Sequence, residues 1–311
     1  MPPMDVLRAL LVAAALTSQA APSPPDTEVF LASLSVRDGQ IEIGKPINIS
    51  NSPGYDNQPS FTPDGQSVLF TSVRGGRKPD PANSAATGSD IYRYEIATER
   101  LSQVTNTPEA EYSPTVTPDG NHVSVIRVEA DGTQRLWRFA LDGTQPELVL
   151  RDIKPVGYHA WGSATALVLF VLGQQGQPAT LQVADLQTGR AEIAATGIGR
   201  SLQRIPGAGV SFVLRDSAAE GQPALIISEI DPVSRQTRPL VRAPAGATDV
   251  DLAWAPDGLL FATIRGQLMS WRRGDREMAA VPGVDGLALP SVTRLAISPK
   301  GDRIALVAPK P

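Results

Sequence analysis

A short turn phrase recurs along this chain and constrains its fold more than any other feature. Each copy is followed by a run rich in apolar and β-branched residues, and the four copies are Phe61–Gly65, Val116–Gly120, Trp254–Gly258 and Ile297–Gly301. In each phrase Pro presets φ at the second turn position, and Gly occupies a later position that needs a positive φ. The phrase therefore predicts a tight turn between two antiparallel strands, four times over.

Two weaker copies lie between the second and third clear ones, at Tyr158–Gly162 and Leu202–Gly207. With them, one anchor residue recurs at intervals of 43 to 55 residues, and the anchors are Pro63, Pro118, Gly162, Pro206, Pro256 and Pro299. This spacing is typical of a propeller blade of four strands. Six anchors therefore predict six blades.

The last repeat is too short to form a whole blade. Only three residues follow Ala308, whereas the segment from Glu28 to Ile49 reads as an outer hairpin with no inner hairpin before it. Joining the two chain ends in one sheet closes the ring and covers its open edges. We therefore predict an all-β, six-bladed β-propeller of four-stranded antiparallel blades, the last closed by N-terminal strands, with Phe30 beside Leu306.

Three segments carry a resemblance to a known repeat: Thr62–Gly65, Asp90–Arg93 and Gln103–Asn106. They resemble the PD40 (WD40-like) repeat of TolB-like propellers and of the propellers in prolyl-oligopeptidase-type peptidases. The first two units match best, and the third and fourth lack the Pro-Asp-Gly turn. The resemblance implies a propeller without the extra α/β domains of those families, and it says little about the ligand.

The N-terminus has the pattern of a secretory signal peptide. Arg8 precedes an apolar run, Ala9–Leu16, and small residues follow at Ala20 and Ala21. An uncleaved membrane anchor would need a longer apolar run. We expect residues 1–21 to be a signal peptide, residues 22–311 to form a single propeller domain, and the protein to be periplasmic or secreted without membrane insertion.

Composition removes several classes of function. The net charge is -4, and no block of Lys or Arg favours binding to nucleic acid. There is no Cys and there are only two His, His122 and His159, so thiolate chemistry and a site of three imidazoles are impossible. The sequence has no Gly-x-Ser-x-Gly elbow, phosphate loop or His-Glu-x-x-His motif. We therefore predict no catalytic residue, metal or cofactor, and a monomer.

The residues that lead into each innermost strand are expected to surround the axis, where propellers commonly bind ligands. The ligand-binding residues that we predict are Asp56, Asn57, Glu111, Tyr112, Arg127, Glu129, His159, Trp161, Arg204, Asp249 and Asp251. Tyr158, His159 and Trp161 favour recognition because their rings combine an apolar body with a polar group. The alternative is that these residues are channel walls satisfied by water, and that Arg127 and Glu129 form an ion pair between blades.

The favoured function is a non-enzymatic, TolB-like binding or scaffold module for a protein, a peptide or a small polar ligand at the central funnel. The alternative is a calcium-dependent lactonase or esterase-like hydrolase, with Asp56, Glu111, Asp249 and Asp251 as candidate ligands of the ion. A long insertion, residues 74–89, is either a linker or a flap that binds a partner.

Overall fold

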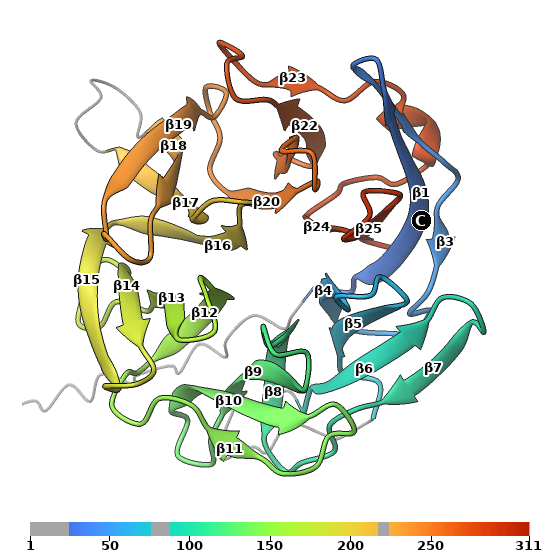
Figure 1. The fold of residues 1–311 in the computed structure, drawn as a ribbon. Coiled ribbons are helices and arrows are strands. Elements are labelled where there is room, and N and C mark those ends of the chain that lie inside the picture. The colour runs from blue at the N-terminus through green and yellow to red at the C-terminus, as the bar shows by residue number, and fades with distance from the viewer. Residues whose placement is uncertain (1–24, 76–87, 217–223, 311) are drawn as a thin grey trace, which may run out of the picture.

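Six sheets surround one axis in the computed structural model of the protein, which describes residues 25–75, 88–216 and 224–310 (Figure 1). Five of the sheets contain four strands in chain order, and neighbouring strands are antiparallel. The predicted fold class is confirmed. The expected signal peptide lies outside the described residues, as do residues 76–87 of the insertion.

Each of the first five blades begins with the strand nearest the axis and ends with the outermost strand. Blade 1 consists of β4 (Asp56–Phe61), β5 (Ser67–Ser72), β6 (Asp90–Glu95) and β7 (Arg100–Gln103). Blade 2 consists of β8 (Ala110–Val116), β9 (His122–Val128), β10 (Gln134–Ala140) and β11 (Glu147–Leu148). Blade 3 consists of β12 (Val156–Trp161), β13 (Ala166–Val171), β14 (Thr180–Asp185) and β15 (Arg190–Thr196).

The later blades follow the same order until the chain closes on itself. Blade 4 consists of β16 (Ile198–Arg204), β17 (Val210–Asp216), β18 (Ala224–Ile230) and β19 (Thr237–Arg242). Blade 5 consists of β20 (Val250–Trp254), β21 (Leu260–Ile264), β22 (Gln267–Trp271) and β23 (Ala279–Ala280), and a short 3₁₀ helix, η1 (Val284–Leu287), follows it. Blade 6 consists of β24 (Arg294–Ile297), β25 (Arg303–Ala308), β1 (Glu28–Arg37) and β2 (Gln40–Ile43), with β3 (Ile47–Asn48) also paired to β1.

Blade 6 joins the two ends of the chain. β1 pairs antiparallel with β25, and Phe30 lies opposite Leu306 as predicted. Alternate residues of β1 point to opposite faces of the sheet. Phe30 packs in the cluster that contains Phe261 of blade 5, whereas Val29 packs in the cluster that contains Phe70 of blade 1. The N-terminal strand therefore fastens the last blade to both of its neighbours.

The turn phrases form the predicted hairpins, and side-chain hydrogen bonds support the turn. Thr62 Oγ1 donates to Asp64 Oδ1 at 2.6 Å, the same oxygen accepts from the backbone N–H of Gln66 at 2.9 Å, and Gly65 has a φ of 69°. Such bonds hold a tight turn in one conformation.

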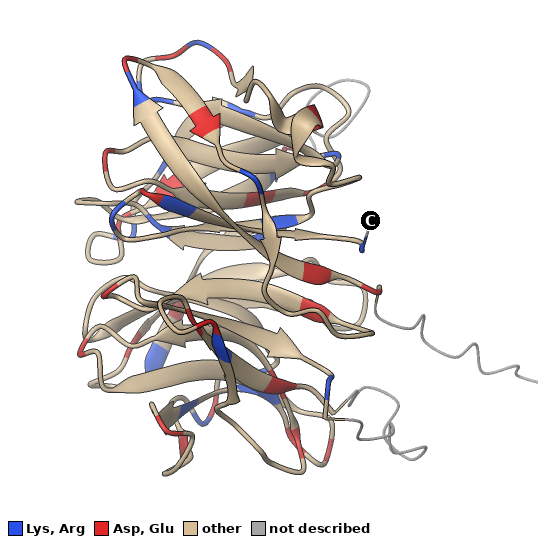
Figure 2. Cartoon of the chain, turned by 90° about the vertical axis from the view of Figure 1, so that its right-hand side faces the viewer, with Lys and Arg blue, Asp and Glu red and all other residues tan. Residues whose placement is uncertain are grey.

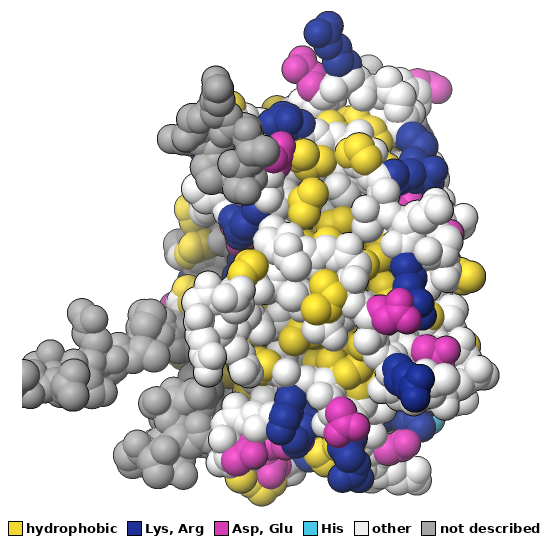
Figure 3. Space-filling model, turned by 90° about the vertical axis from the view of Figure 1, so that its left-hand side faces the viewer, with side chains coloured by type: hydrophobic (Ala, Val, Ile, Leu, Met, Phe, Trp, Pro, Cys, Tyr) yellow, Lys and Arg dark blue, Asp and Glu magenta, His cyan; other side chains and the backbone are white. Residues whose placement is uncertain are grey.

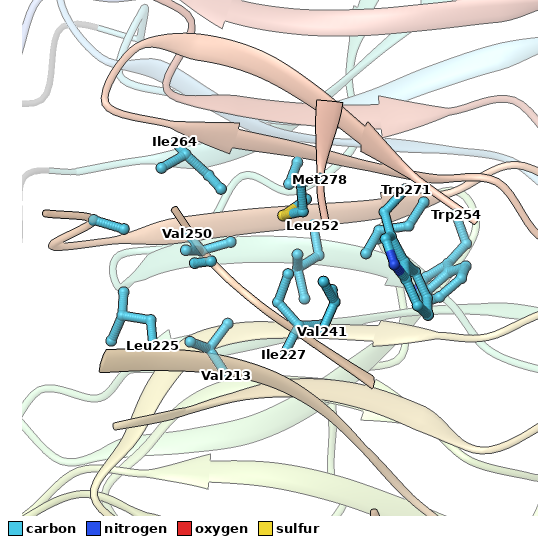
Figure 4. Packing of buried hydrophobic residues seen from close by; sticks show 14 of the residues in the cluster. Val213, Leu225, Ile227, Val241, Val250, Leu252, Trp254, Ile264, Trp271 and Met278 are labelled. Carbon is cyan, nitrogen blue, oxygen red and sulfur yellow. The ribbon is translucent and has the colours of Figure 1, made fainter. Parts of the chain in front are cut away.

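The hydrophobic cores lie between neighbouring sheets. Figure 4 shows the cluster between blades 4 and 5, where Ile227 of β18 and Val213 of β17 face Leu252 of β20. Ile227 and Leu252 are completely buried. Burial of a side chain of this size contributes about 1.5 to 3 kcal/mol, so packing between blades stabilises the ring.

Positions of Lys and Arg alternate with positions of Asp and Glu along the chain in the view of Figure 2. On the side that carries β15, apolar side chains are visible between charged ones (Figure 3), and Ile193 is 62% exposed. Scattered exposed apolar residues of this kind are ordinary on a protein surface. In the described ranges, no helix is both long and apolar enough to cross a membrane.

Candidate functional site

A cavity of about 650 Å³ lies on the axis of the ring. The innermost strand of every blade contributes to its wall: β4, β8, β12, β16, β20 and β24. At one end it is surrounded by exposed prolines of the strand-ending turns, here called the proline rim, which comprises Pro63, Pro118, Pro206, Pro256 and Pro299. A concave site of this volume suits a small ligand or a short peptide. We call this cavity the cup.

Four of the six inner strands are irregular beside the cup. The pairing register shifts within β4, β8, β12 and β16, whereas β20 and β24 pair without a shift. The shifts in β4 and β8 surround Gln58 and Ser113, which have positive φ angles of 56° and 55° although neither is Gly. β-bulges and such strained residues concentrate where a side chain is redirected toward a function.

The bulges of blades 1 and 2 are joined across the wall of the cup. Gln58 Oε1 accepts hydrogen bonds from the backbone N–H of Ser113 at 3.0 Å and from Thr71 Oγ1 at 2.8 Å. These bonds bridge two neighbouring blades and hold both strained residues in place.

The end of the cup opposite the proline rim is barred by a bond across the axis. Arg294 of blade 6 donates from one terminal nitrogen to the hydroxyl of Tyr158 at 2.8 Å and from the other to Asp251 Oδ2 at 3.2 Å. Blades 3 and 6 face each other in the ring (Figure 1), so the bond between Arg294 and Tyr158 spans it. The cavity is therefore a cup with a floor and not an open tube.

The floor is charged: Arg294 and Asp251 are buried, and Tyr158 and the neighbouring Tyr55 are half-buried. Burial raises the pKa of Tyr55 to about 12, with opposing effects from the nearby charges of Arg294 and Arg200. Burial alone would lower the pKa of Arg294, but Tyr158, Asp251 and Tyr55 outweigh it and raise the pKa above its usual value. Arg294 therefore stays charged, and its donors are engaged by Tyr158 and Asp251.

His159 belongs to a buried polar network in the cup wall. Ser124 Oγ donates to the carbonyl of Thr115 at 3.0 Å, and it lies 2.9 Å from Trp161 Nε1 and 2.7 Å from His159 Nε2. With the hydroxyl proton directed to Thr115, His159 Nε2 is the donor in its bond to Ser124, and His159 Nδ1 is buried without a hydrogen-bond partner among the described residues. Burial lowers the pKa of His159 to about 4, so the ring is neutral at physiological pH.

Blade 5 repeats this arrangement without the histidine. Trp254 Nε1 donates to Ser211 Oγ at 2.9 Å, and Ser211 Oγ donates to the carbonyl of Gln203 at 3.1 Å. Trp161 and Trp254 each end an inner strand and bond to a serine of the preceding blade. A repeated bond in a repeated position indicates a structural role in holding neighbouring blades together.

The structure separates the sequence-predicted residues into two groups. Four line the cup: His159, Trp161, Arg204 and Asp251. The other seven are outside its lining: Asp56, Asn57, Glu111, Tyr112, Arg127, Glu129 and Asp249. Most of these seven lie where inner strands begin, on the far side of the floor from the proline rim.

The four carboxylates considered as calcium ligands are each paired with a different arginine. The pairs are Asp56 with Arg74 at 3.3 Å, Glu111 with Arg127 at 3.0 Å, Asp249 with Arg200 at 2.6 Å and Asp251 with Arg294 at 3.2 Å. Within the described part of the chain, no group of three or more His, Cys, Asp or Glu residues could hold a metal ion. This arrangement does not fit a cation site.

Arg127 and Glu129 belong to separate ion pairs within blade 2. Arg127 also lies over the ring of Trp137, at 4.6 Å from its centroid, and Glu129 bonds to Arg135 and to Trp137 Nε1. The sequence suggested an ion pair of Arg127 and Glu129 between blades, and this alternative is wrong because both residues pair within blade 2. Glu111 is completely buried and burial raises its pKa to about 7, although bonds from Thr107 and Arg127 oppose the rise.

The sequence reasoning missed Arg200, whose side chain is 40% exposed at the cup. It also missed Gln58 as a wall residue. The available signals were Gly199, which lies within β16, and the Gln58-Pro59 and Ser113-Pro114 pairs, because Gly and Pro in strands mark bulges.

No protein-family model matches the sequence. A stretch of 86 residues is 30% identical to the Tol-Pal system protein TolB of Francisella tularensis, in strains WY96-3418 and SCHU S4 among others. The match covers 28% of this chain and 17 to 18% of the length of those relatives. The activity and partners of those proteins are therefore not transferred by it.

Solved structures show the same fold at low sequence identity. The protein from Agrobacterium tumefaciens assigned as a TolB has a TM-score of 0.64 and 15% identity, and the match covers 92% of this chain and 99% of that one. TolB from Acinetobacter baumannii has a TM-score of 0.57 and 14% identity, over 92% of this chain and 65% of that one.

An oligogalacturonate lyase in complex with manganese also has this fold, with a TM-score of 0.55 and 13% identity over 86% of this chain and 80% of that one. At such identities the likeness shows the fold alone. The chain is a six-bladed β-propeller that is similar to TolB in fold and, over a stretch of 86 residues, in sequence.

Proposed function

We propose that this protein is a non-catalytic binding module that works outside the cytoplasm and holds a protein segment, a peptide or a small polar ligand in the cup. One observation carries the proposal: a cavity of about 650 Å³ is walled by all six blades and barred at one end by the bond between Arg294 and Tyr158. A ligand would enter past the proline rim. The pattern of residues 1–21 supports export.

The bulges add a second reason to expect binding. The positive φ angles of Gln58 and Ser113 cost about 1 kcal/mol or more each in residues other than Gly. A wall that only closes a ring could avoid this cost, as the regular strands β20 and β24 do. Strain maintained beside a cavity is typical of a site that positions groups for a ligand.

Four defined probes test the proposal: N-acetyl-trialanine, its C-terminal amide, trigalacturonate and maltotriose. Saturation-transfer NMR would detect contact between each probe and the protein. We expect Gln203→Trp, which places an indole inside the cup and narrows it, to weaken strongly the signals that the unaltered protein gives. Gln187→Trp, on an exposed turn of blade 3, is the matched control and should leave them unchanged. Equal signals in all three proteins would place binding elsewhere and refute the proposal.

The second candidate is the calcium-dependent hydrolase, since the lyase neighbour shows that the fold hosts enzymes with a metal ion. Its proposed ligands would first have to leave their arginines, because each carboxylate is already paired. The separation of these carboxylates into four pairs favours the binding module.

A further inference from the structure

The charged residues that line the cup are unbalanced in sign. Three arginines and a single carboxylate line it: Arg200, Arg204, Arg294 and Asp251. The walls and the floor of the cup concentrate the electric field of these charges inside the cavity. This field attracts a ligand of opposite sign. This excess contrasts with the whole chain, whose net charge is -4.

The three arginines differ in their freedom to bind. Arg294 has a side chain that is only 11% exposed, and it is engaged by Asp251 and Tyr158. Arg200 has a side chain that is 40% exposed, and its Nη2 is paired with Asp249 at 2.6 Å. Among the described residues its Nε is buried without a hydrogen-bond partner, so the terminal nitrogens are the ones that can reach a ligand. Arg294 is therefore engaged and its charge is balanced by Asp251, whereas the terminal nitrogens of Arg200 have donors left for a ligand.

Arg200 is also held in position. Asp249 forms its ion pair with the guanidinium from outside the cavity, because Asp249 is not part of the cup lining. The bulge of β16, between Ile198 and Leu202, surrounds Arg200 and sets where its side chain leaves the strand. A planar guanidinium fixed in this way suits a carboxylate, which accepts two parallel hydrogen bonds.

Arg204 lies farther along the same strand, toward the proline rim. It is exposed, and within the described residues it has no ion-pair partner. Its charge is placed to attract an anion before the ligand reaches Arg200.

We propose that the ligand of the cup carries a carboxylate that binds Arg200 near the floor, after attraction by Arg204. This inference rests on the proposed function, because it requires that ligands enter the cup. The chemistry is shared by a peptide with a free C-terminus and by an acidic oligosaccharide. The probes distinguish these two sources.

Isothermal titration with the four probes tests the inference. The two acids, N-acetyl-trialanine and trigalacturonate, are compared with their neutral counterparts, the peptide amide and maltotriose. We expect at least one acid to bind about 10-fold to 100-fold more tightly than its neutral counterpart, the range for a hydrogen bond to a charged group. The acid that shows this preference identifies the source of the carboxylate.

Arg200→Gln should remove the preference while leaving the affinity of the neutral probe unchanged. Arg190→Gln on the exposed strand β15 removes the same charge away from the cup and should leave the preference intact. Thermal unfolding of both variants checks that each one folds.

The possible outcomes distinguish a failure of the carboxylate inference from a failure of the proposed binding function. Equal binding of acids and neutral probes, strongly weakened in Gln203→Trp, would overturn the carboxylate inference and leave the cup as a binding site. A preference that survives Arg200→Gln would overturn the role of Arg200. Failure of all four probes to bind would overturn the proposed function together with this inference.

Discussion

Two glycines in blade 2 allow the packing between blades to be measured with an internal control. Gly132 and Gly143 each stand between Asp and Thr, have φ angles of 79° and 82°, and donate a 2.8 Å backbone hydrogen bond within their turn. They differ in their surroundings. A Cβ on Gly132 would meet nothing within 4 Å, whereas one on Gly143 would lie 1.6 Å from the carbonyl oxygen of Val104, in the segment that follows blade 1.

The structure sets the size of the two effects. An Ala at positive φ costs about 1 to 2 kcal/mol, and this part is common to both sites. Gly143→Ala must in addition push the backbone at Val104 away, and overpacking of this kind costs about 1 to 3 kcal/mol more. We expect Gly132→Ala to lower the free energy of unfolding by about 1 kcal/mol and Gly143→Ala by about 3 kcal/mol or more.

Urea-induced unfolding, followed by tryptophan fluorescence, gives the free energy of unfolding of both variants and of the unaltered protein. The comparison requires that all three have the same dependence of this free energy on urea concentration. The difference between the two variants reports the contact between blades 1 and 2. Equal destabilisation would mean that the turn of Gly143 does not approach Val104, and the blade packing described here would then be wrong.

Three further predictions concern buried polar groups and metal binding. Because burial raises the pKa of Glu111 from 4.5 to about 7, folding favours its protonated form, so its stabilising effect is complete below about pH 4.5 and declines as the pH rises through 7. Glu111→Gln should therefore flatten the pH dependence of unfolding by about 1 to 3 kcal/mol between these values, and an unchanged profile would refute the raised pKa. Ser124→Ala removes the side-chain partner of two buried groups, His159 and Trp161, and should lower the free energy of unfolding in urea by about 2 to 4 kcal/mol. Ser211→Ala removes that of one such ring, Trp254, and should lower it by about half as much. Millimolar calcium should leave the melting temperature unchanged, and a clear rise would favour the hydrolase instead.

The architecture could be predicted because each blade repeats a local signal. Pro63 and Gly65 define a turn through their own backbone preferences, and the same pair recurs in other blades. The closing blade could be predicted because the outer hairpin at Glu28 and the inner hairpin ending at Ala308 complement each other. Turn preferences are local chemistry and the number of blades follows from the number of repeats, and the sequence contains both.

The site was harder to predict because it depends on how strands are displaced. The residues that lead into the inner strands were expected to surround the binding site, but Glu111 is completely buried beside Arg127 and is not part of the cup lining. The cup opens instead at the proline rim, among turns that the sequence indicated only as turns. Arg200 reaches the cup from a bulge, and register shifts of this kind depend on tertiary packing that periodicity does not contain.

A crystal structure of the protein with whichever acidic probe binds more tightly, N-acetyl-trialanine or trigalacturonate, would test the central claim most directly. The account predicts probe density inside the ring, with its carboxylate at Arg200 and its other end toward the proline rim, above a floor where Arg294 still bonds to Tyr158. Probe density confined to the outer surface, or an open axis with Arg294 and Tyr158 apart, would contradict it.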